Sequence, residues 1–553
     1  MRLLFALLFA AALPAAAAVP SKERAVDALF AEYDHTGSPG LAVGVYHQGE
    51  PVYTAGYGYA DLEHNVGITP STQFYIASVS KQFVAFSAAM LARQGKLDLD
   101  GDVRGYLPYV PDFGHRITPR QMIYHTSGLR DQWDLFLLGG RDMSDWLRQG
   151  QVLSMVKRQR ALNFTPGSDH SYSNTGYTLL AELVEATSGS SLREFTDARI
   201  FAPLGMHHTF FNDDVTEIVA NRAHSYQKVD GKWRRMLMNS DSVGATGMFS
   251  TVGDLLKWAG NFSRPVVGDA ALIREVSQMG QLDDGTPMNY GFGLTKERLA
   301  GHPALVHSGV MSGFYALFAY FPETDFAVVL LTNTWMELTP KLEKIVALYL
   351  NEGAMPAAEP LPRAIQPKRA LISALQGEYL RPSGATLALK PDGDGLTMAR
   401  SNFSYRLTLR ADGTFDSGDE PRRSGDFYRP VFDRRGRVTA IEFAGTDTVQ
   451  GQRFVLPRLV RATPSLEELR GLVGNYRSDE LDITYQVALE GGSLMLSSLW
   501  SPAPVKLVAT LTDRFEGVWP TASIVVERDA GGAAVALLVS SGRVRNLRLE
   551  RVP

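Results

Sequence analysis

Ser78 and Lys81 lie three residues apart in the stretch YIASVSKQF, at the start of a long apolar-striped segment. Positions i and i+3 share one face of a helix, so the hydroxyl and the amine can meet. A lysine near a serine can accept its proton when burial or a neighbouring cation lowers the pKa of the amine. The pair could therefore supply a nucleophile and its base.

The spacing alone does not identify this pair as catalytic. An S-x-x-K match is expected by chance about once or twice in a chain of this length. Two further matches are present, Ser154–Lys157 and Ser225–Lys228. The surroundings of each pair must decide between them.

Two other segments carry side chains that could complete a site. Tyr172 and Asn174 lie two residues apart in the turn-rich segment DHSYSNTGY, just before a predicted helix, so both can face one cleft. His307 and Gly309 in LVHSGVMSGF precede a strand that we expect to begin near Phe314. A glycine there would let a substrate approach the backbone closely, and His307 would point into the cleft from a strand edge.

In this order, S-x-x-K, Y-x-N and [K/H]-[ST]-G resemble the motifs of the penicillin-recognising serine hydrolases. The nearest branch looks like the class C β-lactamase type, which includes DD-peptidases, D-aminopeptidases and esterases. The resemblance spans about residues 25–350, and the two other S-x-x-K matches lack its flanking patterns. The supporting segments are ITPRQMIYHTSGL, PGSDHSYSNTGYTLLAELVE, APLGMHHT, GATGMFSTVGDLLKW and YGFGL.

The resemblance implies a role for each motif residue. Ser78 would attack a carbonyl to form an acyl-enzyme, and Lys81, Tyr172 or both would take its proton. Backbone N–H groups of Ser78 and Val310 would form the oxyanion hole. Asn174 would hold the substrate amide or orient Lys81, and Gly309 would belong with Val310 to the substrate-binding edge.

His307 departs from the family pattern, because many β-lactamases carry lysine at this position. A histidine is mostly neutral near pH 7, so it is a weaker anchor for a substrate carboxylate. We therefore predict poor activity on penicillins and cephalosporins. His125 is interpreted as a structural hydrogen-bonding residue. Because no metal-ligand pattern surrounds His207 and His208, we expect neither a metal nor another cofactor.

The composition is that of an ordinary soluble chain. Of 553 residues, 45% are hydrophobic and 21% charged, which allows two to four domains with cores of their own. The net charge is −4 without a basic block, so nucleic acid is not an expected partner. The absence of cysteine excludes thiol nucleophiles, thiolate metal sites and disulfides.

The first residues have the pattern of a secretory signal peptide. An early Arg2, a short apolar run and an A-x-A site at 16–18 predict a signal over residues 1–18. The alternative, an uncleaved anchor, is disfavoured because the apolar run is short for a membrane span. With no second run of that length, we expect a periplasmic or secreted protein without an integral membrane span.

Two hairpin patterns bracket a helical region. Apolar, β-favouring runs around a polar turn occur in Leu41–Asp61 and again in Phe314–Asn333. Between them, apolar residues recur at helix spacing from Val79 to Gly95 and from Tyr177 to Gly189. We predict an α+β domain over residues 19–352. The two ends of the domain should contribute strands to one antiparallel sheet, and helices should flank this sheet.

The remainder is predicted to be all-β. A proline-rich linker over 353–370 precedes short alternating runs that occur twice in the same order. We predict two small, lipocalin-like β-barrels over 371–461 and 462–553, with a structural or gating role. The repeated pairs are LQGEYL and LVGNYR, DGLTM and GSLML, LRADGTF and LTDRF, LPRLV and LRLERV.

Three functions remain open at this point. The first is a peptidase or amidase directed at D-amino acids, and the second is a carboxylesterase or β-lactamase-like hydrolase with the same machinery. The third is a non-catalytic cell-envelope binding protein, which the joint presence of Ser78, Lys81, Tyr172 and His307 disfavours. The expected partner is a small peptide, amide or ester, with cell-wall fragments among the candidates. The sequence leaves the oligomeric state open.

Overall fold

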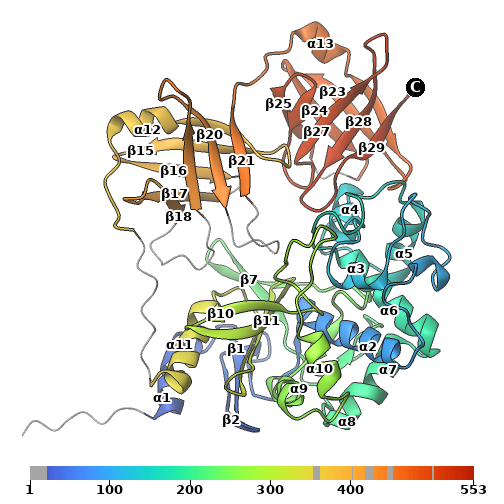
Figure 1. Cartoon of the computed structure of the whole chain (residues 1–553), viewed down its shortest axis with the longest axis vertical. Helices are drawn as coiled ribbons and strands as arrows, with labels where there is room; N and C mark the ends of the chain where they lie inside the picture. The colour runs from blue at the N-terminus through green and yellow to red at the C-terminus, as the bar shows by residue number, and fades with distance from the viewer. Residues whose placement is uncertain (1–20, 353–361, 401–402, 418–426, 445–452, 501–502) are drawn as a thin grey trace, which may run out of the picture.

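The computed structural model describes residues 21–352, 362–400, 403–417, 427–444, 453–500 and 503–553 (Figure 1). The predicted signal peptide and the first half of the predicted linker lie outside these residues. A helical and sheet-containing domain is followed by two barrels, which lie above it in Figure 1. No helix of the described residues combines the length and the apolar character needed to cross a bilayer.

The first domain is built on a six-stranded antiparallel sheet in the order β10-β11-β12-β13-β1-β2. Strand β1 from the beginning of the domain pairs with β13 from its end, with Leu41 opposite Thr332. The prediction that the two ends close one sheet is therefore confirmed. The strands are β1 (Leu41–His47), β2 (Glu50–Tyr57), β10 (Thr295–Leu299), β11 (His302–Met311), β12 (Phe314–Phe321) and β13 (Phe326–Thr332).

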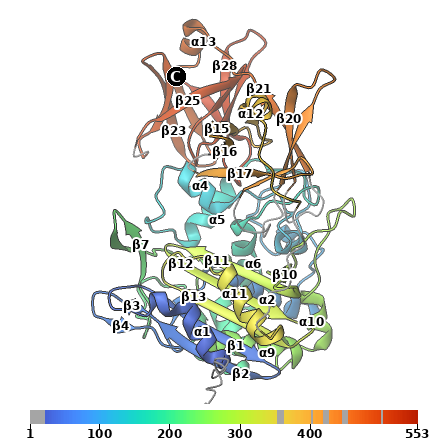
Figure 2. The same ribbon diagram turned by 90° about the vertical axis from the view of Figure 1, so that its left-hand side faces the viewer.

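Helices cover both faces of this sheet. Successive residues of β13 alternate between two apolar clusters, so this strand is buried on both sides. Helices α1 (Lys22–Phe30) and α11 (Thr339–Leu350) pack on one face, as Figure 2 shows. The other face carries α2 (Lys81–Arg93), α6 (Asn174–Ser188) and α9 (Val252–Ser263). The remaining helices of the domain are α3 (Pro119–Ile123), α4 (Gln132–Leu138), α5 (Gln149–Arg158), α7 (Leu192–Thr196), α8 (Ala202–Leu204) and α10 (Ala270–Val276).

One element differs from the sequence prediction. His307 and Gly309 lie within strand β11, which pairs with β12, and they do not simply precede the strand at Phe314. The turn between these strands is Ser312–Gly313. Small residues at four positions of HSGVMSG weaken the β signal there, because they have little side chain to pack on a sheet.

The tail forms two closed, eight-stranded antiparallel barrels, which confirms the predicted duplication. The first consists of β14 (Gly377–Leu380), β15 (Thr386–Asp392), β16 (Gly395–Arg400), β17 (Phe403–Leu409), β18 (Phe415–Ser417), β19 (Phe427–Phe432), β20 (Val438–Ala444) and β21 (Arg453–Leu459). The second consists of β22 (Gly474–Ser478), β23 (Ile483–Glu490), β24 (Ser493–Ser498), β25 (Val505–Leu511), β26 (Arg514–Glu516), β27 (Ser523–Arg528), β28 (Ala534–Ser540) and β29 (Leu547–Val552).

The same side-chain contacts close the start of each barrel. The Tyr379 hydroxyl donates to the Leu375 carbonyl at 2.7 Å in the first barrel, and Tyr476 donates to Leu472 at 2.9 Å in the second. Each tyrosine follows a short helix, α12 (Arg369–Leu375) or α13 (Leu466–Arg470). The predicted domain boundaries at 352, 370 and 461 themselves stay predictions.

The two barrels differ in how they join the first domain. The apolar core of the second barrel is continuous with the core that contains α2 and α6, whereas the core of the first barrel is a separate cluster. In Figure 1 the second barrel lies against α4. The buried Tyr485 hydroxyl of this barrel donates to the carbonyl of Leu138, the last residue of α4.

Candidate active site

Ser78 lies at a sharp turn from a strand into a helix. Strand β5 (Phe74–Tyr75) leads into the 3-10 turn η2 (Ala77–Ser80), which continues directly as α2. Ala77 adopts a φ of 47°, which costs on the order of 1–3 kcal/mol for a residue with a side chain. Strain of this kind is typical of functional sites, and Ser78, the second residue of the turn, is partly exposed.

Lys81 is completely buried, and three oxygen atoms surround its amine. Nζ lies 3.1 Å from Ser78 Oγ, 2.9 Å from Asn174 Oδ1 and 2.7 Å from the Ala245 carbonyl oxygen. The two carbonyl-type oxygens can only accept hydrogen bonds, whereas the serine hydroxyl can also donate.

This arrangement fits a neutral amine. A neutral amine has two hydrogens for the two carbonyl oxygens, and its lone pair is then left for the Ser78 hydroxyl proton. Burial lowers the pKa of Lys81 well below its usual value; attraction to Asp131 opposes this effect, and repulsion by Arg543 adds to it. The geometry therefore favours Lys81 as the base that takes the proton of Ser78.

Tyr172 lies next to Ser78 and Lys81. Burial raises the pKa of its phenol, while a side-chain hydrogen bond with Ser78 and the charge of Arg543 lower it by less. The Lys81 amine lies 4.7 Å from the centre of the Tyr172 ring. Because the phenol keeps its proton at neutral pH, Tyr172 is suited to donate a proton and not to accept the first one.

Asn174 is the first residue of α6, and both ends of its amide are held by the protein. Its Oδ1 accepts from Lys81, and its Nδ2 donates to Asp131 Oδ2 at 2.8 Å. The Asn174 backbone N–H donates to the same carboxylate oxygen at 2.7 Å. Of the two roles left open for Asn174, the structure favours the orientation of Lys81.

Sequence reasoning did not identify Asp131. Its carboxylate is buried and also caps the N-terminus of α4 by accepting from Trp133 at 3.0 Å. An aspartate just before an apolar helix is a recognisable N-cap signal. The contact with Asn174 arises only when the chain folds, so no local pattern could reveal it.

His307 is buried and is held as a neutral imidazole. Its Nδ1 donates to the Ser308 carbonyl at 2.6 Å, so Nε2 is left to accept from the Tyr290 hydroxyl at 3.1 Å. Burial is the main cause that lowers its pKa, to about 3. Tyr290, from the segment YGFGL, is a further residue of the site to which the sequence analysis gave no role.

Gly309 permits β11 to pack directly against the turn that carries Ser78. A Cβ built on Gly309 would lie 2.2 Å from the Ile76 carbonyl oxygen and 2.9 Å from the Ser78 backbone nitrogen. The glycine is thus required by the approach of protein backbone, not only by the approach of a substrate as the sequence suggested.

Val310 has the position expected of an oxyanion donor. Strand β10 pairs with β11 only as far as Val306. The backbone groups of β11 after Val306 on that edge therefore do not pair with β10. The two-residue turn after Met311 makes Met311 and Phe314 a hydrogen-bonded pair, and the N–H groups alternate along the strand. The Val310 N–H therefore points away from β12, toward the edge at which Ser78 lies.

His125 stabilises the segment that carries Tyr172. The Ser173 backbone N–H donates to His125 Nδ1 at 3.1 Å, and the imidazole lies 4.2 Å from the Tyr172 ring. Burial lowers the pKa of His125 well below its usual value. These contacts agree with the structural role that the sequence suggested.

The two other serine–lysine pairs do not form comparable groups. Ser154 Oγ donates to the Gly150 carbonyl on α5 at 2.8 Å, and Ser225 Oγ donates to the Ser312 carbonyl at 2.6 Å. Among the described residues, neither lysine makes a hydrogen bond with its serine. Of the three matches, the pair at Ser78 is the one that the fold joins to Tyr172 and Asn174.

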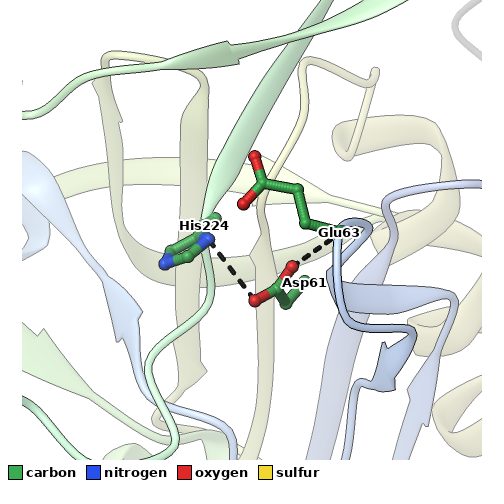
Figure 3. A group of neighbouring side chains, drawn as sticks. All are labelled: Asp61, Glu63 and His224. Atoms are coloured by element: carbon green, nitrogen blue, oxygen red, sulfur yellow. Dashed lines mark hydrogen bonds and ion pairs between the residues drawn. The ribbon is translucent and has the colours of Figure 1, made fainter.

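A separate titratable group forms where Asp61, Glu63 and His224 meet (Figure 3). Candidate ligand atoms of these residues lie within 4.8 Å of one another. The Arg235 guanidinium, however, lies 3.3 Å from His224 Nε2 and 3.7 Å from Glu63. Because this fixed positive charge opposes a bound cation, we assign no metal to the group, and the expectation of a cofactor-free site stays a prediction.

Replacing Gly309 by alanine should lower kcat/KM by roughly 100-fold or more, since a misplacement of about 1 Å at a reacting group has this effect. The added methyl group would push β11 away from Ile76 and Ser78. Gly105→Ala is a matched control, because a Cβ at Gly105 meets no atom within 4 Å. Equal activity of both variants, with unchanged circular dichroism, would contradict the role of this contact.

The pH–rate profile should have its acid limb at a pH set by Lys81. Activity requires the neutral amine, so kcat/KM should rise with pH and reach its plateau well below the ordinary lysine pKa of about 10.4. His307, with a pKa of about 3, stays neutral over this range, and His307→Gln should keep the limb at the same pH. An activity that continues to rise beyond pH 10 would show that the base is an ordinary, unperturbed amine.

The chain is similar in sequence and in fold to proteins of known family. A family model described as Beta-lactamase matches residues 26–349. A D-aminopeptidase of Cereibacter sphaeroides is 29% identical over 548 residues, which cover 96% of this chain and 98% of that protein. The matched part therefore includes both barrels as well as the sheet domain.

Two solved structures share the fold. The octameric penicillin-binding protein homologue from Pyrococcus abyssi has a TM-score of 0.53 at 23% identity, covering 78% of this chain and 99% of that one. The D-amino acid amidase from Ochrobactrum anthropi has a TM-score of 0.51 at 22% identity, and the match covers 61% of this chain and 100% of that chain. The predicted fold and the family resemblance are confirmed.

Proposed function

We propose that this chain, which belongs to the Beta-lactamase family and is a serine hydrolase, cleaves the amide bond that follows a D-amino acid. The observation that carries the chemistry is the buried Lys81 amine, which is saturated by two carbonyl oxygens and faces Ser78. The preference for D-amino acids is supported by the D-aminopeptidases that align with the whole chain, barrels included.

Acylation begins with attack of Ser78 Oγ on the substrate carbonyl while its proton passes to Lys81 Nζ. The backbone N–H groups of Ser78 and Val310 receive the charge that develops on the carbonyl oxygen, worth roughly 3–4 kcal/mol for one such donor. When the C–N bond breaks, Tyr172 donates its proton to the leaving nitrogen. The Lys81 ammonium returns a proton to the phenolate, so the proton of the serine ends on the leaving amine.

Deacylation reverses the same steps with water in place of the amine. Water loses a proton to the base as it attacks the acyl carbon, and Ser78 Oγ regains a proton as the ester bond breaks. The products are a carboxylic acid and an amine, and both Lys81 and Tyr172 return to their starting states. No cofactor is needed to balance the reaction.

The neutral state of His307 argues for peptides or amides over β-lactams. A neutral imidazole that already donates to Ser308 and accepts from Tyr290 offers no charge for the carboxylate of a penicillin or cephalosporin. Hydrolysis of these drugs should therefore be poor. The first residues support export, so we place the enzyme in the periplasm or outside the cell, where D-amino acids of cell-wall origin would be met.

The test is a screen of the purified protein against matched D- and L-alaninamide, a D-Ala-D-Ala peptide, p-nitrophenyl acetate and nitrocefin. We expect the D-amide to exceed its L-enantiomer by about 100-fold or more in kcat/KM, since the wrong hand misplaces the reacting carbonyl. Turnover of the ester alone would instead support the carboxylesterase alternative. Efficient nitrocefin hydrolysis at neutral pH would contradict the reading of His307.

A further inference from the structure

One loop of the second barrel reaches the catalytic residues of the first domain. This loop, residues 541–546, connects β28 and β29 and contains Arg543. The Arg543 guanidinium carbon lies 4.9 Å from the centre of the Tyr172 ring. The barrel therefore places a positive charge beside the phenol that serves the leaving group.

Backbone contacts on both sides fix Arg543 in place. Its N–H donates to Asp134 Oδ2 at 2.7 Å, and Ser541 Oγ donates to the same atom at 2.7 Å. Its carbonyl accepts from the Asn163 side-chain amide at 2.9 Å and from the Asp131 backbone N–H at 3.3 Å. The loop is thus tied to Asp134 within α4 and to Asp131, the residue that orients Asn174.

Buried charges anchor the loop further. The Arg130 guanidinium donates to the Arg545 and Asn546 carbonyl oxygens at 3.1 and 3.2 Å and forms an ion pair with the buried Glu480. Arg545 pairs with Asp169 at 2.9 Å. These contacts hold the backbone of the loop in one conformation. The fold therefore sets the direction in which the Arg543 side chain points.

The Arg543 guanidinium is exposed and carries an unneutralised charge. Within the described residues, no carboxylate lies at ion-pair distance from it, and none of its side-chain nitrogens makes a hydrogen bond. The neighbouring carboxylates are engaged elsewhere. Asp134 accepts from Ser541 and from the Arg543 backbone, Asp131 binds Asn174, and Asp169 binds Arg545.

A free guanidinium in a fixed position is suited to a planar, bidentate carboxylate. Tyr172 stands where the leaving nitrogen must be protonated, so a group that binds against Arg543 belongs to the leaving part of the substrate. A C-terminal amino acid has its carboxylate one carbon from that nitrogen. A primary amide has nothing there.

We propose that Arg543 binds the carboxylate of the leaving amino acid, so that the substrate is a D-aminoacyl peptide with a free C-terminus one residue beyond the scissile bond. This inference rests on the proposed function and narrows its substrate class. It assigns to the second barrel a direct part in substrate selection, from the β28–β29 loop. A substrate with a positive charge at that position is disfavoured by the same guanidinium.

The experiment compares D-alanyl-glycine with D-alanyl-glycinamide, which differ only in the terminal charge. The wild type should prefer the free acid by roughly tenfold to a hundredfold in kcat/KM, the range expected of a charge-assisted hydrogen bond. In Arg543→Gln this ratio should fall toward 1, mainly through KM. Arg543→Lys should retain part of the preference, and Arg543→Glu should reverse it.

Arg545→Gln is the matched control, because it weakens the same loop through Asp169 but leaves the charge of Arg543. It should preserve the ratio of acid to amide. A wild type that cleaves both compounds equally well would overturn the inference and leave the proposed function standing. The same conclusion would follow if Arg543→Gln and Arg545→Gln changed the ratio alike. If neither D-alanyl compound is cleaved although D-alaninamide is, the inference alone fails; if D-alaninamide also resists, the proposed function fails with it.

Discussion

Ser78→Ala should reduce kcat/KM by about 10⁴-fold or more, because loss of the nucleophile of a serine hydrolase removes the covalent route altogether. The hydroxyl that would be lost lies 3.1 Å from the Lys81 amine and next to Tyr172. The measurement is the hydrolysis of D-alaninamide together with labelling by a fluorophosphonate probe. Both signals should disappear while the far-UV circular dichroism stays the same.

Two serines of the chain provide controls for this variant. Ser154 belongs to another S-x-x-K match, but its hydroxyl donates to a carbonyl of its own helix. Ser80 is buried two residues from Ser78, and its hydroxyl donates to the Ala77 carbonyl at 2.5 Å. Ser154→Ala should behave as the wild type, and probe labelling should persist in Ser80→Ala. Labelling that survives in Ser78→Ala would place the nucleophile elsewhere.

Lys81→Met should reduce kcat/KM by about 10²- to 10⁴-fold, the usual contribution of a general base. Methionine has a similar length and fills the buried site, but it cannot accept the serine proton. The substitution also leaves Asn174 Oδ1 and the Ala245 carbonyl without their donor, at a cost of roughly 1–3 kcal/mol for each buried acceptor. The melting temperature must therefore be measured beside the rate.

Lys81→Arg distinguishes the role of Lys81 as a base from its role as a hydrogen-bond donor. Arginine can still donate to both carbonyl oxygens, yet it stays protonated at every working pH. If Lys81 is the base, this variant should be as inactive as Lys81→Met although more of its contacts are kept. Substantial activity in Lys81→Arg would transfer the role of base to Tyr172. Lys157→Met, in the exposed S-x-x-K match, should have no effect on the rate.

The fold was predictable where the signal is local or repeated. The hairpin around Gln48 has apolar, β-favouring runs on both sides of a polar turn, and the helix ending at Gly189 has an apolar stripe followed by a left-handed glycine cap. The barrels were recognisable because four pairs of similar short segments occur in the same order, although each pair alone is a weak signal. Strand β11 was not predicted, because glycine and serine interrupt its pattern around His307, whereas the strand expected near Phe314 is β12.

The site was predictable only in part, for a physical reason. The motif residues Ser78, Lys81, Tyr172 and His307 stand in short patterns that a reader of the sequence can compare with a family. The contacts that Asp131 and Arg543 make depend on tertiary approach. An N-cap aspartate and a loop arginine have ordinary local surroundings, and only folding brings them to Asn174 and Tyr172.

The continuity between the second barrel and the hydrolase core has a consequence for how the molecule comes apart on heating. Side chains that share one apolar cluster tend to lose their order together. The first barrel keeps its own cluster and is joined to the second through Arg461, which pairs with Glu378 of the first barrel and with Glu516 of the second. Calorimetry should then resolve two endotherms. The larger one would combine the hydrolase domain with the C-terminal barrel, so the middle segment of the chain melts alone while its two neighbours in sequence melt as one cooperative unit.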